Sequence, residues 1–176
     1  MNLLYACKND DYNKVKLLIG NNSDLNLKDI NGKSPLHIAC ENGNFNIVKL
    51  LIEKGSDVHA KNYLEETPLH ETCKNGNIDI FKLLIENEVN INNMNFYAKT
   101  PLHIACENGN FDIVESLIEN EADVNTIDIC KETPLHEACK NGNVDIVKLL
   151  IENKVNMNIK NYWRKIVLDV LFNIFV

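Results

Sequence analysis

The chain has 176 residues, 45% of them apolar, and a formal net charge of −7 at pH 7. The sequence has no basic cluster, which argues against a nucleic acid as the main partner, because phosphate binding needs concentrated Lys and Arg. No apolar run is long enough to cross a bilayer, and the first residues lack the profile of a secretory signal. We therefore expect no membrane span and a cytoplasmic location, with the nucleus not excluded.

A pattern of 33 residues recurs along almost the whole chain. Each copy begins Ser/Thr-Pro-Leu-His, and the period is marked by His37, His70, His103 and His136. Self-similarity at this spacing is typical of a stack in which each unit buries its apolar face against its neighbours. The period therefore predicts an array of repeats and no single central core.

In chain order, residues 1–28 are expected to form an N-terminal capping repeat, because 3–19 keeps the register without the Pro, the His or the first Gly. Four full repeats are predicted at 29–61, 62–94, 95–127 and 128–160. Residues 161–176 are predicted to begin a truncated C-terminal repeat. Together these segments predict one array over residues 1–176.

Each full repeat predicts the order helix, turn, helix, loop. The Ser or Thr hydroxyl caps the first helix, and Pro takes the first helical position, where no N–H is needed. That helix ends at a glycine such as Gly43, and the second helix, such as 45–53, has apolar residues at helical spacing. About a dozen residues then form a hairpin-like loop. The predicted fold class is all-α.

The motif Thr-Pro-Leu-His-x-Ala, the helix-ending Gly and the Asp-Val-Asn at 123–125 resemble ankyrin repeats over nearly the whole chain. The resemblance implies an α-solenoid of helix-turn-helix units with projecting β-hairpin-like loops. It implies a non-catalytic scaffold or adaptor that binds a protein partner through hairpin tips and inner helices. The alternative is a targeting segment of a larger protein, such as an enzyme, a ubiquitin-ligase adaptor or a channel.

Two turn positions that usually hold Gly in such units hold other residues in the later repeats. If the left-handed geometry is kept, each non-glycine residue at these positions costs about 1–2 kcal/mol. The alternative is that Asn87, Asn120 or Asn153 takes over the helix cap one residue earlier. We therefore expect the C-terminal half to be the less stable half. The replacing residues are Glu65, Ala98, Lys131, Arg164, Glu88, Glu121 and Lys154.

The periodic Cys and His residues are interpreted as structural. Five cysteines recur at one helical position, where helices about 8–10 Å apart exceed the reach of a disulfide. Only Cys130, in a loop, is expected to be exposed. The histidines lie beside the capping Ser or Thr, so we predict no catalytic constellation, no cofactor and no metal site. The frequent Asn is interpreted as a compositional bias of the coding sequence.

A second period spans two repeats. Repeats two and four share His-Ile-Ala-Cys-Glu, whereas repeats three and five share His-Glu-x-Cys-Lys. Two rows of side chains should therefore alternate along the inner helices and offer a partner a mixed surface. The rows are Ile38, Glu71, Ile104 and Glu137, and Glu41, Lys74, Glu107 and Lys140.

Equivalent positions in successive loops carry apolar and aromatic residues, which predict a protein interface because uncovered loop tips are normally polar. The alternative is that these side chains fold back onto neighbouring tips. The candidate protein-binding residues are Ile30, Tyr63, Leu64, Glu66, Glu71, Lys74, Phe96, Tyr97, Lys99, Ile104, Glu107, Ile129, Glu132, Glu137, Lys140, Tyr162 and Trp163.

The last segment, 166–176, has nine apolar residues out of eleven, whereas a terminal repeat should show water a polar face. Three interpretations stay open: a piece of a longer array, a contact with a partner or another copy of the chain, and a buried half-cap. We favour truncation, with self-association through 166–176 as the second hypothesis.

Overall fold

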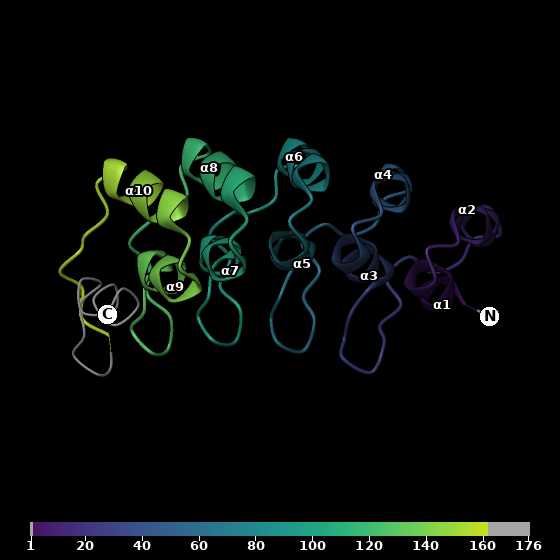
Figure 1. The fold of residues 1–176 in the computed structure, drawn as a ribbon. Helices are drawn as coiled ribbons and strands as arrows, with labels where there is room; N and C mark the ends of the chain where they lie inside the picture. Colours follow the sequence, from purple (N-terminus) through teal and green to yellow (C-terminus); the bar gives the residue numbers. More distant parts are fainter. Residues whose placement is uncertain (1, 162–176) are drawn as a thin grey trace. The chain divides into compact units, whose positions relative to one another are not determined.

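A computed structural model describes residues 2–161 of the chain. Over this range the chain forms ten α-helices and no β-strand (Figure 1). The chain divides into two compact units, residues 1–90 and 91–176. The boundary lies in the connector that follows the sixth helix, so whole helix pairs belong to one unit or the other.

The first unit is built from three helix pairs. In each pair a short first helix is followed, after a tight turn, by a second helix of nine residues. The pairs are α1 (Leu3–Lys8) with α2 (Tyr12–Gly20), α3 (Pro35–Asn42) with α4 (Phe45–Glu53), and α5 (Pro68–Asn75) with α6 (Ile78–Glu86).

The second unit contributes two helix pairs to the described range. They are α7 (Pro101–Asn108) with α8 (Phe111–Glu119), and α9 (Pro134–Asn141) with α10 (Val144–Glu152). The predicted helix boundaries are confirmed, and so is the all-α fold class.

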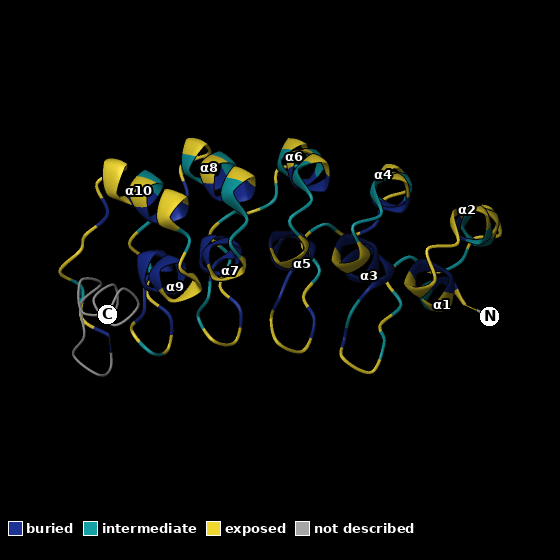
Figure 2. Cartoon of the chain, in the orientation of Figure 1, coloured by how far each residue is buried: buried dark blue, intermediate teal, exposed yellow. Residues whose placement is uncertain are grey.

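The first helix of each full repeat starts where the Ser/Thr-Pro signal places it. A capping box closes the N-terminus of α3, α5, α7 and α9, with Pro in the first turn. These helices are almost wholly buried, as Leu36, Ala39 and Cys40 show in α3. The second helices bury one face only, for example Ile47 and Leu51 of α4, and turn the other to water (Figure 2).

The left-handed turns keep their geometry without glycine. Gly43 ends α3 at φ 73°, as its sequence position predicts. Glu88, Glu121 and Lys154 follow the second helices at φ 57°, 66° and 59°. The asparagines before them cap those helices at negative φ, so an asparagine does not take over the left-handed position. The backbone strain therefore stays on the non-glycine residues.

Asparagine side chains tie neighbouring repeats together. Asn42 Nδ2 donates to the Cys7 carbonyl at 3.2 Å, and Asn75 Nδ2 donates to the Glu41 carbonyl at 3.1 Å. Asn77 Nδ2 donates to the Gly43 carbonyl at 3.2 Å. The second unit repeats the last two bonds through Asn141 and Asn143. These amides add donors to backbone carbonyls at helix ends, where the carbonyls of Cys7 and Gly109 also accept from Asp10 and Phe111 N–H.

Some predictions fall outside the described residues. They concern Tyr162, Trp163, Arg164 and the apolar segment 166–176. The grouping of residues 1–176 into one array also stays a prediction. Among the described helices, none combines the length and the apolar character that a membrane crossing needs.

Replacing Glu121 by Gly should stabilise the protein by about 1 kcal/mol, because Gly adopts the left-handed conformation without the Cβ clash. Glu121 is exposed and has φ 66°. Urea denaturation followed by circular dichroism measures the change.

The matched control is Gly55→Ala, at φ 88° with nothing within 4 Å of the added Cβ, which should destabilise the protein by a similar amount. A destabilised Glu121→Gly variant would contradict the assignment of strain to this position.

Candidate functional site

Each projecting loop ends in a five-residue tip that is closed by its own backbone. In the tip 62–66, Asn62 N–H donates to the Glu66 carbonyl at 3.0 Å, and Glu65 N–H donates to the Asn62 carbonyl at 3.0 Å. The Asn62 side-chain oxygen accepts from the N–H groups of Leu64 and Glu66 at 2.8 and 3.0 Å. The tip backbone is therefore held in one conformation without a partner.

The same Asx residue opens every described tip. The side-chain oxygens of Asp29, Asn95 and Asp128 each accept two N–H bonds from within their tips, at 2.8–3.0 Å. These residues were not among the predicted site residues. The sequence could have indicated them, because an Asp or Asn recurs every 33 residues at the first position of each tip. They determine which side chains of the tip point outward.

The tip side chains are exposed, as predicted. In the first unit Ile30 is 92% and Tyr63 68% exposed, and Leu64 is also exposed. In the second unit Phe96 is 67% exposed, with Tyr97 and Ile129 exposed beside it. Figure 2 shows exposed residues along the loops that precede α3, α5, α7 and α9. Large apolar side chains thus stand in water at successive tips.

Neighbouring tips also contact each other, so the fold-back alternative holds in part. Tyr63 N–H donates to the Asn31 carbonyl at 3.0 Å. A Cβ built on Gly32 would lie 2.7 Å from Tyr63 Cδ1, so the Tyr63 ring crosses this glycine. In the second unit Phe96 and Tyr97 form an edge-to-face pair with ring centroids 5.5 Å apart. These contacts orient the rings but leave most of the Tyr63 and Phe96 surface uncovered.

Two lysines of the first unit form one network with three glutamates. Lys33 Nζ lies 2.9 Å from a carboxylate oxygen of Glu41 and 3.0 Å from one of Glu71. Lys74 Nζ lies 2.8 Å from Glu66 and 3.4 Å from Glu71. Glu71 is buried, and both ammonium groups lie close enough to stabilise its charge. The network joins α3, α5 and the loop that precedes each.

The second unit repeats this network. Lys99 Nζ lies 2.8 Å from both Glu107 and Glu137, and Lys140 bridges Glu137 and Glu132. Burial lowers the pKa of Lys99, but the hydrogen bonds and charges of Glu107 and Glu137 outweigh it and raise that pKa. Burial raises the pKa of the Glu137 carboxyl, but Lys99 outweighs it and holds the pKa below its ordinary value. Lys99 and Glu137 therefore stay ionised near neutral pH.

The predicted rows of accessible inner-helix side chains are therefore wrong for half of their members. Ile38, Glu71, Ile104 and Glu137 are buried, because their helices pack there against the rest of the unit. The loop glutamates Glu66 and Glu132 are buried as well. The other charged candidates, Lys74, Lys99, Glu107 and Lys140, have partners within the chain. Contact of any of these residues with a protein partner stays a prediction.

Three overlapping segments match a family model described as ankyrin repeats (3 copies), namely residues 3–95, 54–128 and 88–161. The chain belongs to the ankyrin-repeat family. Ankyrin repeats are in general protein–protein interaction modules, and the family is typically non-catalytic. Comparison with curated proteins gives no match.

The periodic histidines connect one ankyrin repeat to the next. His37 Nδ1 accepts from the Ser34 N–H at 3.2 Å, while Nε2 lies 2.9 Å from the Glu66 carbonyl. A carbonyl only accepts, so Nε2 carries the proton and the ring is neutral. His103 makes the same contact with the Glu132 carbonyl at 3.0 Å. Burial lowers the pKa of His37 and of His103, which favours this neutral form.

The cysteines of the ankyrin frame are buried thiols. Burial raises the pKa of Cys7, Cys40 and Cys139 to about 12, so these groups are not nucleophiles at neutral pH. Cys130, predicted to be the one exposed thiol, is half-buried, and it is the only one of the six cysteines that is not buried.

A buried acidic cluster lies in the second unit. Carboxylate oxygens of Asp128, Glu132 and Glu137 lie within 4.8 Å of one another. Lys99 and Lys140 pair with two of these carboxylates, and Asp128 accepts N–H bonds from its own tip. The cluster is therefore part of the ion network described above, in which two of its three carboxylates pair with lysines.

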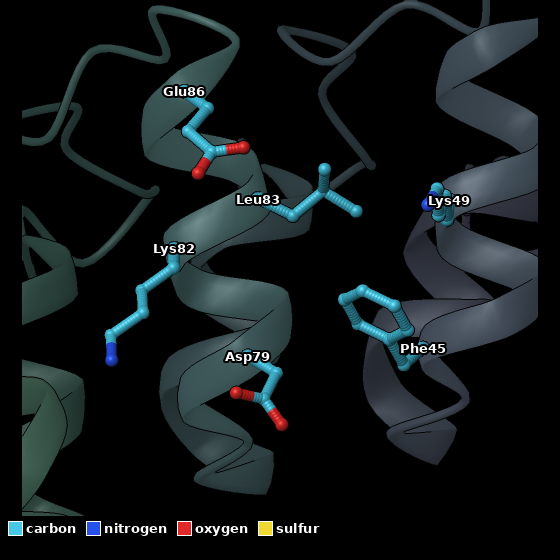
Figure 3. A pocket seen from close by; sticks show the side chains of 6 residues that line it. All are labelled: Phe45, Lys49, Asp79, Lys82, Leu83 and Glu86. Carbon is cyan, nitrogen blue, oxygen red and sulfur yellow. The ribbon is translucent and has the colours of Figure 1, made fainter.

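A shallow groove of about 330 Å³ lies between α4 and α6 (Figure 3). Phe45 and Leu83 face each other across it. Its charged lining residues, Lys49, Asp79, Lys82 and Glu86, form no ion pair with any described residue. The lining contains no Ser, Thr, Cys or His side chain.

Replacing Lys99 by Met should destabilise the protein by about 1–3 kcal/mol, because Glu137 is buried and loses its nearer cation. The loss stays below that of an isolated buried pair, since Lys140 remains beside Glu137. Urea denaturation at neutral pH measures the difference. In the control Lys148→Met, which removes an exposed pair with Asp145, the change should stay below about 0.5 kcal/mol.

Stability should fall as the pH is lowered from 7.5 to 5.5. The folded state keeps His37 and His103 neutral, whereas in the unfolded chain they take up protons near the ordinary value of 6.5. Each contributes up to about 1.4 kcal/mol per pH unit below that value. Glu66 and Glu137 have lowered pKa values, so their contribution is lost only below the ordinary value of 4.5.

Urea titrations at three pH values in this window test the histidine contribution. Equal stability at pH 7.5 and 5.5 would rule out neutral buried histidines.

Proposed function

We propose that this chain is a non-catalytic scaffold or adaptor that binds a protein partner through the tips of its ankyrin loops. The observation that carries the proposal is the exposure of Tyr63 and Phe96 on tips whose backbones are already satisfied. Aromatic side chains of this kind supply much of the binding energy at protein interfaces. We place the protein in the cytoplasm, in keeping with its six free cysteines.

The rigid tips favour binding because little order has to be created when a partner arrives. Asn62 and Asn95 each hold two N–H groups of their own tip, so the backbone is ordered in the free protein. The Phe96 ring is oriented by its edge-to-face contact with Tyr97. Preorganised aromatic groups lose less conformational entropy on binding than flexible chains do.

The paired charges of the chain favour the exposed apolar residues of the tips over the charged residues as the main contact. Lys33 and Lys74 in the first unit, and Lys99 and Lys140 in the second, are paired with glutamates of the same chain. A partner that used these charges would have to break internal ion pairs. A partner that contacts the exposed apolar side chains of the tips breaks no internal ion pair.

The triple variant Tyr63→Ser, Phe96→Ser, Tyr97→Ser should reduce partner affinity more than about 100-fold, because each aromatic anchor contributes on the order of 2 kcal/mol. The partner is first captured from a lysate of the source cells with the wild-type chain, identified by mass spectrometry, and produced in pure form. Its dissociation constant is then measured by calorimetry for both proteins.

The control variant, Leu17→Ser with Ile151→Ser, removes two exposed apolar side chains from second helices. It should bind the partner as the wild type does. Helical circular dichroism must be equal for all three proteins. Unchanged affinity of the triple variant, or loss of its helical signal, would refute the tips as the interface.

A further inference from the structure

In one tip of each unit, the second residue donates a backbone hydrogen bond to the preceding tip. In the first unit, Tyr63 N–H donates to the carbonyl of Asn31 at 3.0 Å. In the second unit, the equivalent Ile129 N–H donates to the carbonyl of Tyr97 at 3.1 Å. Successive tips therefore associate through one backbone hydrogen bond and the side chain of the residue that donates it.

The first tip, 29–33, has this donor but no preceding tip. Ile30 occupies the position of Tyr63 and Ile129, and its N–H has no acceptor among the described residues. Its side chain is 92% exposed, more than that of any other large apolar residue in the described range. The capping repeat before it consists of α1, α2 and a connector, and it presents no carbonyl to Ile30. The first tip thus presents an unpaired N–H donor next to an exposed apolar side chain.

The contact with the following tip shows what would fit this edge. The carbonyl of Asn31 accepts from Tyr63, and the next residue is Gly32, where a Cβ would lie 2.8 Å from the Tyr63 backbone nitrogen. In the second unit the equivalent of Gly32 is Ala98, the next smallest residue. An occupant must therefore offer a free carbonyl followed by a small residue at positive φ, as Gly32 (77°) and Ala98 (56°) are, a conformation that a β-branched residue such as Val does not tolerate.

We infer that Ile30 receives an apolar-x-Gly turn of the partner protein, whose x carbonyl accepts a hydrogen bond from the Ile30 N–H and whose apolar residue covers the Ile30 side chain. This inference rests on the proposed function and specifies part of it. The partner's turn would occupy the place of a further tip, directly before the first tip of this chain. Recognition of this kind reads a backbone shape and one small residue, as in the addition of a strand to an exposed sheet edge.

The probe is a backbone-cyclised peptide that carries Asp-Ile-Asn-Gly-Lys, the sequence of residues 29–33. The test protein is the full chain with an ester in place of the amide between Asp29 and Ile30, which removes only the Ile30 N–H. It is made by ligating a synthetic 1–39 thioester to the remainder at Cys40. The ester also weakens the Asp29 carbonyl, which accepts from Gly32 N–H, so equal thermal unfolding against an all-amide ligated protein is required.

Binding is followed by two-dimensional NMR. In the all-amide protein the Ile30 amide proton should shift downfield as the peptide is added. The ester should weaken peptide binding about three- to tenfold, the share of one net hydrogen bond. Replacement of Ile30 by Ser should weaken it further, and a peptide with Val in place of Gly should not bind. Equal binding by the ester protein, or by the Val peptide, would overturn the inference.

Two further outcomes separate the inference from the proposed function. If the ester protein binds the purified partner normally while the triple aromatic variant does not, the proposed function stands and the inference about Ile30 falls. If the peptide binds at Ile30 while the triple variant retains full partner affinity, the inference about Ile30 stands and the proposed function falls. An Ile30 amide shift that depends on protein concentration alone would identify a second copy of the chain as the occupant and would also overturn it.

Discussion

The rest of the structure depends on one buried hydrogen bond, from a neutral histidine to a carbonyl in the following repeat. His37 reaches the Glu66 carbonyl and His103 reaches the Glu132 carbonyl. The same histidines cap their own helices through Ser34 and Thr100. One ring thereby fixes where a helix begins and where the next loop returns, so the tip of that loop projects from a defined base. Because the ring is buried, both nitrogens must be satisfied, and only one tautomer can do so.

The two-repeat period acquires a physical meaning from the ion networks. The repeats that carry His-Ile-Ala-Cys-Glu supply Lys33 or Lys99. The repeats that carry His-Glu-x-Cys-Lys supply the buried Glu71 or Glu137. Each buried glutamate also pairs with a lysine of its own repeat, Lys74 or Lys140, so the alternation places a second cation, from the preceding repeat, beside it. The alternation that looked like a mixed surface for a partner is mainly an internal arrangement. This moves the candidate interface from the inner helices to the loop tips.

Much of the fold was readable from local signals. The Ser/Thr-Pro start, the helix-ending Gly and the apolar spacing each act within a few residues, and the helices begin and end where these signals place them. The exposure of Tyr63 and Phe96 was also predictable from their loop positions. The burial of Glu71 was not, because a glutamate on a first helix is normally solvated unless a cation comes from another repeat. The role of Asn75 was missed for the same reason, since its acceptor lies 34 residues away.

The sequence by itself determined the repeat, its period, its helices and the family, because these depend on local conformational preferences and on a motif that each copy carries whole. Only the tertiary structure decided which charged residues face a partner and which face each other, because ion pairs form between side chains that the packing of separate repeats brings together. It also decided that Ile30 differs from its equivalents Tyr63 and Ile129. Their sequence positions are the same, but only theirs are preceded by another tip.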